Sequence, residues 1–142
     1  MHEILRMAHL IMIAMMTGMA VSHYILLRAS AGREGESGKA LALARRTLGD
    51  FSTMVVAFVW LTGVTLFWSQ YAAAGREVSA WFYVKIAFVV ALTGAHIMQR
   101  ITSRRIGGLS IEGRRKIERY VSIVWLCALL AICLAVISFT PR

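Results

Sequence analysis

The amino-acid sequence predicts an all-α membrane fold, an antiparallel bundle of four transmembrane helices with short loops, as one domain over residues 1–142. Hydrophobic residues make up 58% of the chain, well above the ~45–50% of an ordinary soluble domain. They gather in four runs, and each run approaches the ~20 residues that a helix needs to cross ~30 Å of hydrocarbon. Because the connections between the runs are short, neighbouring helices should pack antiparallel.

The four predicted spans are residues 4–28, 51–71, 78–100 and 120–139. The first should stay in the mature chain, because it is long for a signal peptide and its flanks lack the small-residue cleavage pattern. In the fourth, Cys127 and Cys133 would point about 120° apart on a helix and should not form a disulfide. The second ends and the third begins in aromatic side chains of the kind that gather at a membrane surface, namely Trp68, Tyr71, Trp81, Phe82 and Tyr83.

The positive charge of the chain predicts its orientation. The formal net charge is +9, and the basic residues are concentrated in a first loop, residues 29–50, and a third loop, residues 101–119. The second loop carries only Arg76 as a base. Since basic short loops stay in the cytoplasm, we expect both of them to be cytoplasmic in a bacterial inner membrane, with both termini in the periplasm. This orientation explains the charge without nucleic acid, which a soluble protein of this charge would suggest as a partner.

Four ionisable side chains fall inside the predicted spans, and such groups are costly in hydrocarbon and normally face the bundle interior. His9 and His23 are fourteen residues apart, which places them within ~40° of one helix face. Lys85 and His96 are eleven residues apart, within ~20° of one face. Both spans run inward, so we predict an outer polar layer of His9 and Lys85 and an inner layer of His23 and His96.

Each of these residues also has an ordinary structural explanation. Lys85 could snorkel to the outer interface. His23 and His96 could be interfacial histidines that bond to the backbone, and His9 could be a hydrogen-bonded structural histidine. Each pair lies on one face of its helix, and independent interfacial residues need not align in this way. The alignment therefore favours a shared interior site.

The histidines suggest a cofactor. Neutral imidazole is a common metal ligand and a standard axial ligand of haem iron, and the interior of a helix bundle is where such cofactors sit. His9, His96 and His23 are therefore candidate ligands of a haem b, and Met54 is a candidate sixth ligand. One haem is easier to support than two, because His2 is the only other histidine at the level of His9.

The methionines of the first span give a competing hypothesis. Thioethers together with imidazole suit Cu(I), although Met also fills an apolar bundle without any ligand. Copper is therefore the alternative cofactor. The residues concerned lie before and after His9 in the sequence and are Met7, Met12, Met15, Met16 and Met19.

Several short motifs also follow one another in the order typical of one family. They are Met7-Ala-His-Leu10 and Arg28 in the first span, Trp60 and Gly63 in the second, and Trp81-Phe-Tyr-Val-Lys85 and Ala95-His96 in the third. Together they resemble the HemJ-type membrane protoporphyrinogen oxidase family, and the wider group that includes the CopD-type copper-resistance membrane proteins. Met15-Met16-Thr17 and Tyr120-Val-Ser-Ile123 depart from the family pattern, so the chain looks like a diverged relative.

The resemblance implies a haem b in the bundle, and either oxidation of protoporphyrinogen IX to protoporphyrin IX or the passing of electrons in the membrane. It implies that His9 is the haem ligand and that Lys85 and Arg28 are catalytic partners, since cationic side chains suit porphyrin propionates. A porphyrin or a quinone-type molecule would be the small-molecule partner. Two alternatives stay open: a CopD-like protein of copper transport or handling, and a non-catalytic subunit of a larger membrane complex or homo-oligomer.

Overall fold

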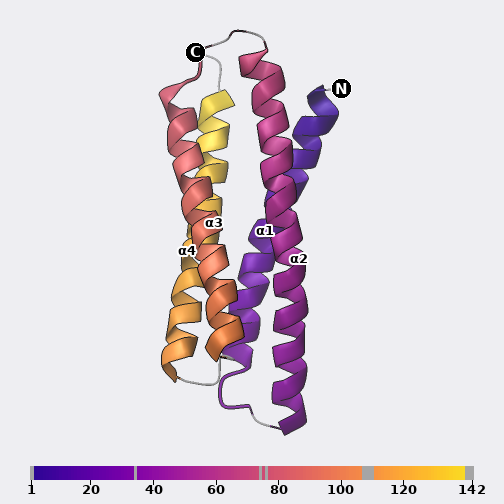
Figure 1. Cartoon of the computed structure of the whole chain (residues 1–142), viewed down its shortest axis with the longest axis vertical. Helices are drawn as coiled ribbons and strands as arrows, with labels where there is room; N and C mark the ends of the chain where they lie inside the picture. The colour runs from indigo at the N-terminus through magenta and orange to yellow at the C-terminus, as the bar shows by residue number, and fades with distance from the viewer. Residues whose placement is uncertain (1, 34, 74, 76, 107–110, 140–142) are drawn as a thin grey trace.

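The computed structural model describes residues 2–33, 35–73, 75, 77–106 and 111–139, with the side chains of residues 2, 105, 106, 111 and 135–139 excepted. Its helices are α1 (His2–Ala29), α2 (Gly35–Phe67), the π-helical turn η1 (Trp68–Ala72) that continues α2, α3 (Ala80–Ile106) and α4 (Ile111–Phe139). These described residues contain no β-strand, and successive helices run in opposite directions (Figure 1). The predicted antiparallel all-α bundle is confirmed. Arg76 and the His2 side chain lie outside the described residues.

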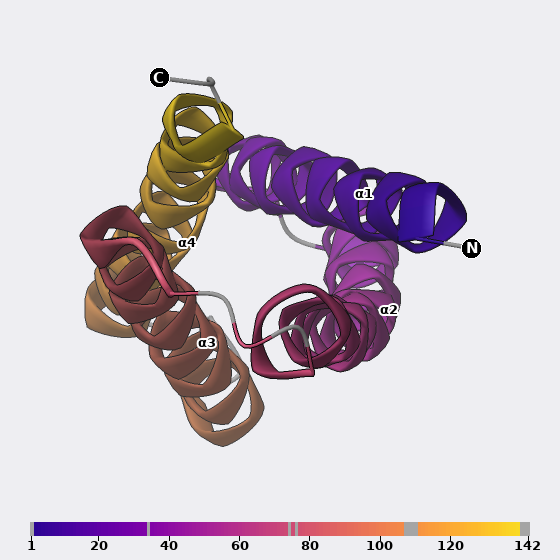
Figure 2. The ribbon, with the colours of Figure 1, turned by 90° about the horizontal axis from the view of Figure 1, so that it is seen from above.

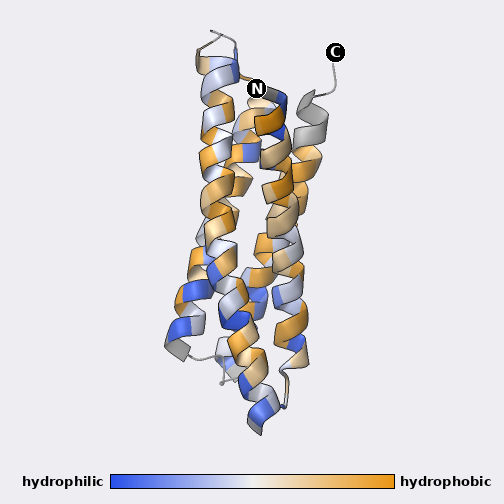
Figure 3. Ribbon diagram, turned by 90° about the vertical axis from the view of Figure 1, so that its right-hand side faces the viewer, coloured by the Kyte–Doolittle hydropathy of each residue, from blue (hydrophilic) through white to orange (hydrophobic). Residues whose placement is uncertain are grey.

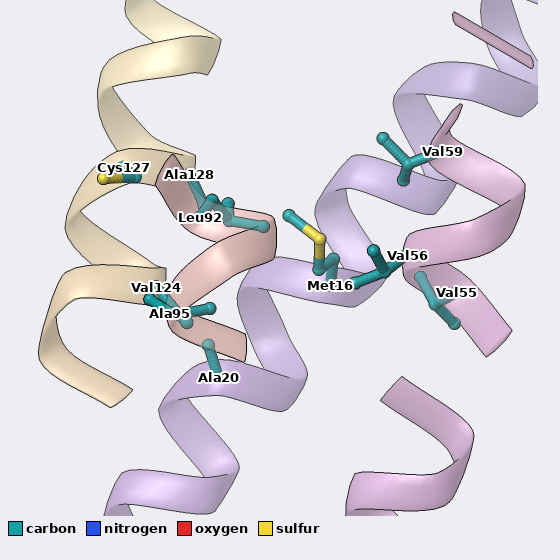
Figure 4. Close-up of a cluster of buried hydrophobic side chains, with 10 residues drawn as sticks. All are labelled: Met16, Ala20, Val55, Val56, Val59, Leu92, Ala95, Val124, Cys127 and Ala128. Atoms are coloured by element: carbon teal, nitrogen blue, oxygen red, sulfur yellow. The ribbon is translucent and has the colours of Figure 1, made fainter. Parts of the chain in front are cut away.

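The helices surround a main apolar core, and a smaller apolar cluster of Leu27, Ile117 and Val121 lies nearer the loop between α1 and α2. α1 packs against α2 and α4, and α4 also packs against α3 (Figure 2). All four long helices contribute to the core, with Met16 from α1, Val56 from α2, Leu92 from α3 and Ala128 from α4 (Figure 4). Leu92 is one of the most completely buried side chains, with 2% of its surface exposed. This core sits between the two polar layers and holds their spacing.

Polar side chains make several of the contacts between α2 and α3. Trp60 Nε1 donates a hydrogen bond to Thr93 Oγ1 at 3.0 Å. Nearer the loop between α1 and α2, Arg100 pairs with Asp50, and the same guanidinium lies against Gly49. A side chain at position 49 would collide with this guanidinium, so the glycine is what admits the arginine between the helices.

The outer surface of the bundle is apolar and suits a lipid bilayer. Each of the four long helices has the length and the apolar composition that a membrane span requires. Large apolar side chains such as Ile4, Leu61 and Val64 point outward with more than half of their surface exposed, as lipid-facing residues do. Hydrophilic residues gather where α1 and α3 end and α2 and α4 begin (Figure 3), and we call this region the basic end. The chain is therefore a multi-pass membrane protein with four spans.

The helices at the basic end are longer than the predicted spans, with α3 reaching Ile106. α2 begins at Gly35 and α4 at Ile111, so most of the segments predicted as loops, residues 29–50 and 101–119, are helical. The prediction used the number of apolar residues needed to cross the hydrocarbon of a bilayer. This criterion says nothing about helical turns that continue into water. The added turns carry ion pairs one turn apart, with Lys39 Nζ 2.9 Å from Glu36 and Lys116 Nζ 2.8 Å from Glu112, and such pairs stabilise exposed helix surface.

The predicted aromatic belt lies at the end opposite the basic end. The ring of Phe82 at the start of α3 stacks on Phe67 of α2, with centroids 5.2 Å apart, and lies 5.9 Å from the ring of Tyr71 in η1. Trp68 and Tyr83 point outward, with 68% and 64% of their surface exposed. These rings join α2 to α3 across their connection and present aromatic faces to a membrane surface.

Candidate functional site

His9 lies on the face of α1 that meets α2. A threonine of α2 determines which nitrogen of its ring carries the proton. The Thr62 hydroxyl donates its single hydrogen to the Phe58 carbonyl oxygen at 2.7 Å. In the 2.8 Å contact between His9 Nδ1 and Thr62 Oγ1, the hydroxyl therefore accepts and Nδ1 donates. This network assigns the proton of neutral His9 to Nδ1, so Nε2 carries the available lone pair.

A glycine of α2 allows the His9 ring to lie close to the helix backbone. A Cβ built at Gly63 would lie 3.2 Å from Cε1 of His9, so the imidazole rests against the bare backbone of α2. Thr62 fixes one edge of the ring, and Gly63 allows the ring to approach the helix this closely. Neither residue was predicted to contact His9, although Gly63 belongs to the motifs that carry the family resemblance.

Lys85 shares the outer layer with His9, as the helix faces predicted. Its ammonium lies near enough to act on the His9 ring electrostatically, and its side chain is partly buried. Within the described residues Lys85 has no hydrogen bond or ion pair. A cation inside a membrane bundle is costly without a counter-charge or water, so this position favours a carboxylate from a ligand.

The inner layer brings His23 and His96 together, and the two rings are close enough to influence each other electrostatically. His96 is 3% exposed, and its Nε2 lies 3.1 Å from Thr53 Oγ1. Because the Thr53 hydroxyl donates to the Gly49 carbonyl oxygen at 2.9 Å, Nε2 of His96 is the donor. His23 is 7% exposed, and its Nε2 is buried with no hydrogen-bond partner among the described residues. The two layers therefore differ, with His9 held by α2 and His23 left unsatisfied.

A cavity of about 580 Å³ opens at the basic end beside His23. We call it the basic cavity, and its polar lining includes four arginines of α2 and α3 but no carboxylate. The sequence prediction assigned these arginines to membrane orientation alone. The pair Arg45-Arg46 could have been placed toward the bundle had helix α2 been extended to Gly35. The polar or basic side chains that line it include His23, Arg45, Arg46, Gln99, Arg100 and Arg104.

Arg28, predicted as a partner of Lys85, lies at the basic end, away from Lys85. It is nineteen residues from His9 along α1, roughly 28 Å at the rise of an α-helix, whereas Lys85 is at the level of His9. The Arg28 guanidinium donates hydrogen bonds to the Tyr24 hydroxyl at 3.0 and 3.2 Å and lies 3.7 Å from Glu118. The structure therefore does not bring the two predicted catalytic residues together.

The sulfur candidates divide between the two sides of α1 and α2. Met54 is 58% exposed on the outer face of α2, away from the histidines. Met7 and Met15 also point outward, with 61% and 37% of their surface exposed. Met16 is buried in the core and Met12 packs against it, so these two share the inward face of α1 with His9.

Together these features define a four-helix integral membrane protein with imidazole and ammonium groups inside the bundle. Comparisons with protein-family models, curated proteins and solved structures found no match to the chain. Among the described residues, no three His, Cys, Asp or Glu side chains are grouped to hold a metal ion. A function must therefore be argued from single ligands and their surroundings.

Proposed function

We propose that the protein is a haem-b-binding membrane oxidoreductase of the HemJ type, in which Nε2 of His9 would bind the iron. The observation that carries the proposal is the orientation of the His9 ring. Histidines that bind metals almost always donate their other ring N–H to an oxygen acceptor, which fixes the tautomer and makes the ligating nitrogen more basic. His9 has this arrangement, with Nδ1 bonded to Thr62.

The residues around His9 fit a haem in charge as well as in ligand type. A haem carries carboxylate side chains, and the Lys85 ammonium near His9 has no counter-charge among the residues that the structure describes. A charge-assisted hydrogen bond from Lys85 to such a carboxylate is strengthened where water is excluded. When bound, haem b would supply one-electron redox chemistry.

Each side chain then has a stated role. His9 would bind and orient the cofactor, Thr62 holds the proton on Nδ1, and Gly63 leaves room for the imidazole against α2. Lys85 would bind a carboxylate of the haem or of a porphyrinogen substrate. Electrons would pass to a quinone-type acceptor within the membrane. The activity that best suits this set is oxidation of protoporphyrinogen IX, or electron transfer by a relative that has lost it.

Loss of the His9 imidazole should remove the cofactor. Protein purified in a neutral detergent should show a Soret band, and His9→Ala should lower its absorbance per protein at least about tenfold, as expected when a haem loses its protein ligand. His23→Ala and His96→Ala are the matched controls and should keep the band, because the proposal gives the iron to His9. Retention of the band in His9→Ala together with its loss in His96→Ala would move the ligand to the inner layer.

Copper handling is the second candidate, and one observation favours it. Met12 and Met16 share the inward face of α1 with His9, and soft thioethers with imidazole bind Cu(I). Under this alternative the purified protein would be colourless and would bind Cu(I). The same absorption measurement therefore separates the two candidates before any variant is made.

A further inference from the structure

The basic cavity has the size and lining of a ligand site. Its volume of about 580 Å³ falls within the ~300–1,000 Å³ of ordinary small-molecule pockets. It is lined by residues of all four long helices at the basic end, with Ile117 as the contribution of α4. His23, its innermost polar group, is about 21 Å along α1 from His9. The basic cavity is therefore distinct from the proposed haem site.

Positive charge in the basic cavity is only partly balanced by the residues that the structure describes. Of the four arginines that line it, Arg100 pairs with Asp50. Half-buried Arg45 has only a 3.4 Å hydrogen bond to the neutral Ser30 hydroxyl. Arg46 and Arg104 form no ion pair within the described residues. Arg46 and Arg104 are exposed and Arg45 is half-buried. Gathering these like charges around one cavity is unfavourable, so the arrangement favours a bound anion.

His23 supplies the second, independent observation. It is 93% buried, since only 7% of its surface is exposed. In the part of the chain that the structure describes, its Nε2 has no hydrogen-bond partner, although the residue lines the basic cavity. Buried polar atoms are nearly always paired, and an orphan in a native fold points to a missing partner. Protein atoms cover this nitrogen in the structure, so it would donate to an oxygen of an anion held by the arginines after a small shift of the covering side chains.

We propose that the basic cavity binds a phosphate group, held by Arg45 and Arg46 on α2, Arg100 and Arg104 on α3, and His23 on α1. Guanidinium forks match phosphate oxygens in bidentate geometry, and several arginines around one anion are typical of phosphate recognition. The phosphate could belong to the headgroup of an anionic lipid, which lies at the depth of the basic end, or to a soluble phosphate. The cavity is open enough for either.

Thermal unfolding of the purified full-length protein in neutral detergent tests this site, because a ligand that binds only the folded state raises the midpoint. The probes are inorganic phosphate, mixed micelles containing phosphatidylglycerol, and mixed micelles containing phosphatidylcholine. A shift with inorganic phosphate identifies a soluble anion, and a shift with phosphatidylglycerol alone identifies a lipid headgroup. Both results support the proposal. No shift with either of these two probes would overturn it.

Paired variants assign the binding to the basic cavity. Arg45→Gln/Arg46→Gln should weaken binding of the active probe at least about tenfold, since it removes two charge-assisted donors. Arg115→Gln/Arg119→Gln removes the same charge from the exposed face of α4 and should change binding less than about twofold, as screened surface charges contribute little. Equal losses of affinity in the two variants would mean that net charge alone explains the binding, and this would contradict the proposal.

Two further variants keep the comparison informative. Arg45→Lys/Arg46→Lys keeps the charge but removes the planar forks, so its affinity should fall between those of the native protein and the glutamine variant. Should the double glutamine variant fail to fold, Arg46→Gln alone, at an exposed residue, carries the test against Arg115→Gln. Phosphate binding should persist in His9→Ala, so failure of the haem proposal and failure of this one can be told apart.

Discussion

Gly63→Leu should abolish haem binding while leaving the membrane bundle folded. Even a Cβ at this position would lie 3.2 Å from Cε1 of His9, and the branched end of a leucine would occupy the place of the imidazole. The ring would have to leave Thr62 and lose the hydrogen bond that orients it. Leucine is a better helix former than glycine, so α2 itself should not suffer. We expect the Soret absorbance per protein to fall at least about tenfold, as when an orienting contact of a metal ligand is lost.

Gly94→Leu is the matched control for this prediction. Gly94 lies on α3, and a Cβ there would meet nothing within 4 Å, so the added side chain should enter lipid without moving any protein group. Its Soret absorbance should equal that of the native protein. If Gly63→Leu kept a full Soret band with an unchanged spectrum, the contacts of His9 with Thr62 and Gly63 would not be what positions the iron ligand.

Leu92→Ala should cause the largest loss of stability among single substitutions in the core. Leu92 is 2% exposed and belongs to the cluster that joins all four long helices. Truncating it leaves a cavity, for which soluble proteins lose about 2–5 kcal/mol. In a micelle or bilayer the helices pack without the usual hydrophobic driving force, so only the packing part of this cost applies. We expect the free energy of unfolding to fall by about 2 kcal/mol, measured by denaturant titration in mixed micelles.

Leu61→Ala provides the same chemical change on the lipid-facing side. Leu61 is 63% exposed on α2, and its truncation should alter the free energy of unfolding by less than about 0.5 kcal/mol. Equal effects of the two substitutions would mean that the core of Figure 4 does not hold the bundle together.

The membrane fold could be predicted from the sequence because it rests on one strong signal. Four apolar runs of membrane length determine the number of helices, and short connections determine their antiparallel order. The true ends of α2 and α4 could not be found this way. Gly35 and Ile111 begin these helices in charged segments, where helix formation depends on ion pairs and local packing rather than on hydrocarbon thickness.

The two polar layers could also be predicted, because helical periodicity and direction decide which side chains share a depth. What holds each ring could not. Thr62 is an ordinary threonine of an apolar helix that bonds back to its own backbone. Its contact with His9 depends on the rotation of α2 against α1, which periodicity within one helix does not determine. The same limit explains why Met54 was a candidate ligand although it faces outward.

The basic cavity was missed for a different reason. Arginines near a membrane surface are explained well enough by orientation, and this explanation hides any second role. Only the structure places Arg45 of α2 and Arg100 of α3 around one cavity with His23. For Arg28 the resemblance to a family residue implied a catalytic role, and the structure adds the contacts of its guanidinium with Tyr24 and Glu118.

Haemin titration of His9→Gly, with and without added imidazole, tests the central claim most directly. The variant removes the ligand and leaves a space in which free imidazole can stand in for the lost side chain. If His9 binds the iron, the variant should bind haemin poorly, and added imidazole should restore the Soret band of the native protein. The account would be contradicted if His9→Gly bound haemin as tightly as the native protein and its spectrum did not respond to imidazole.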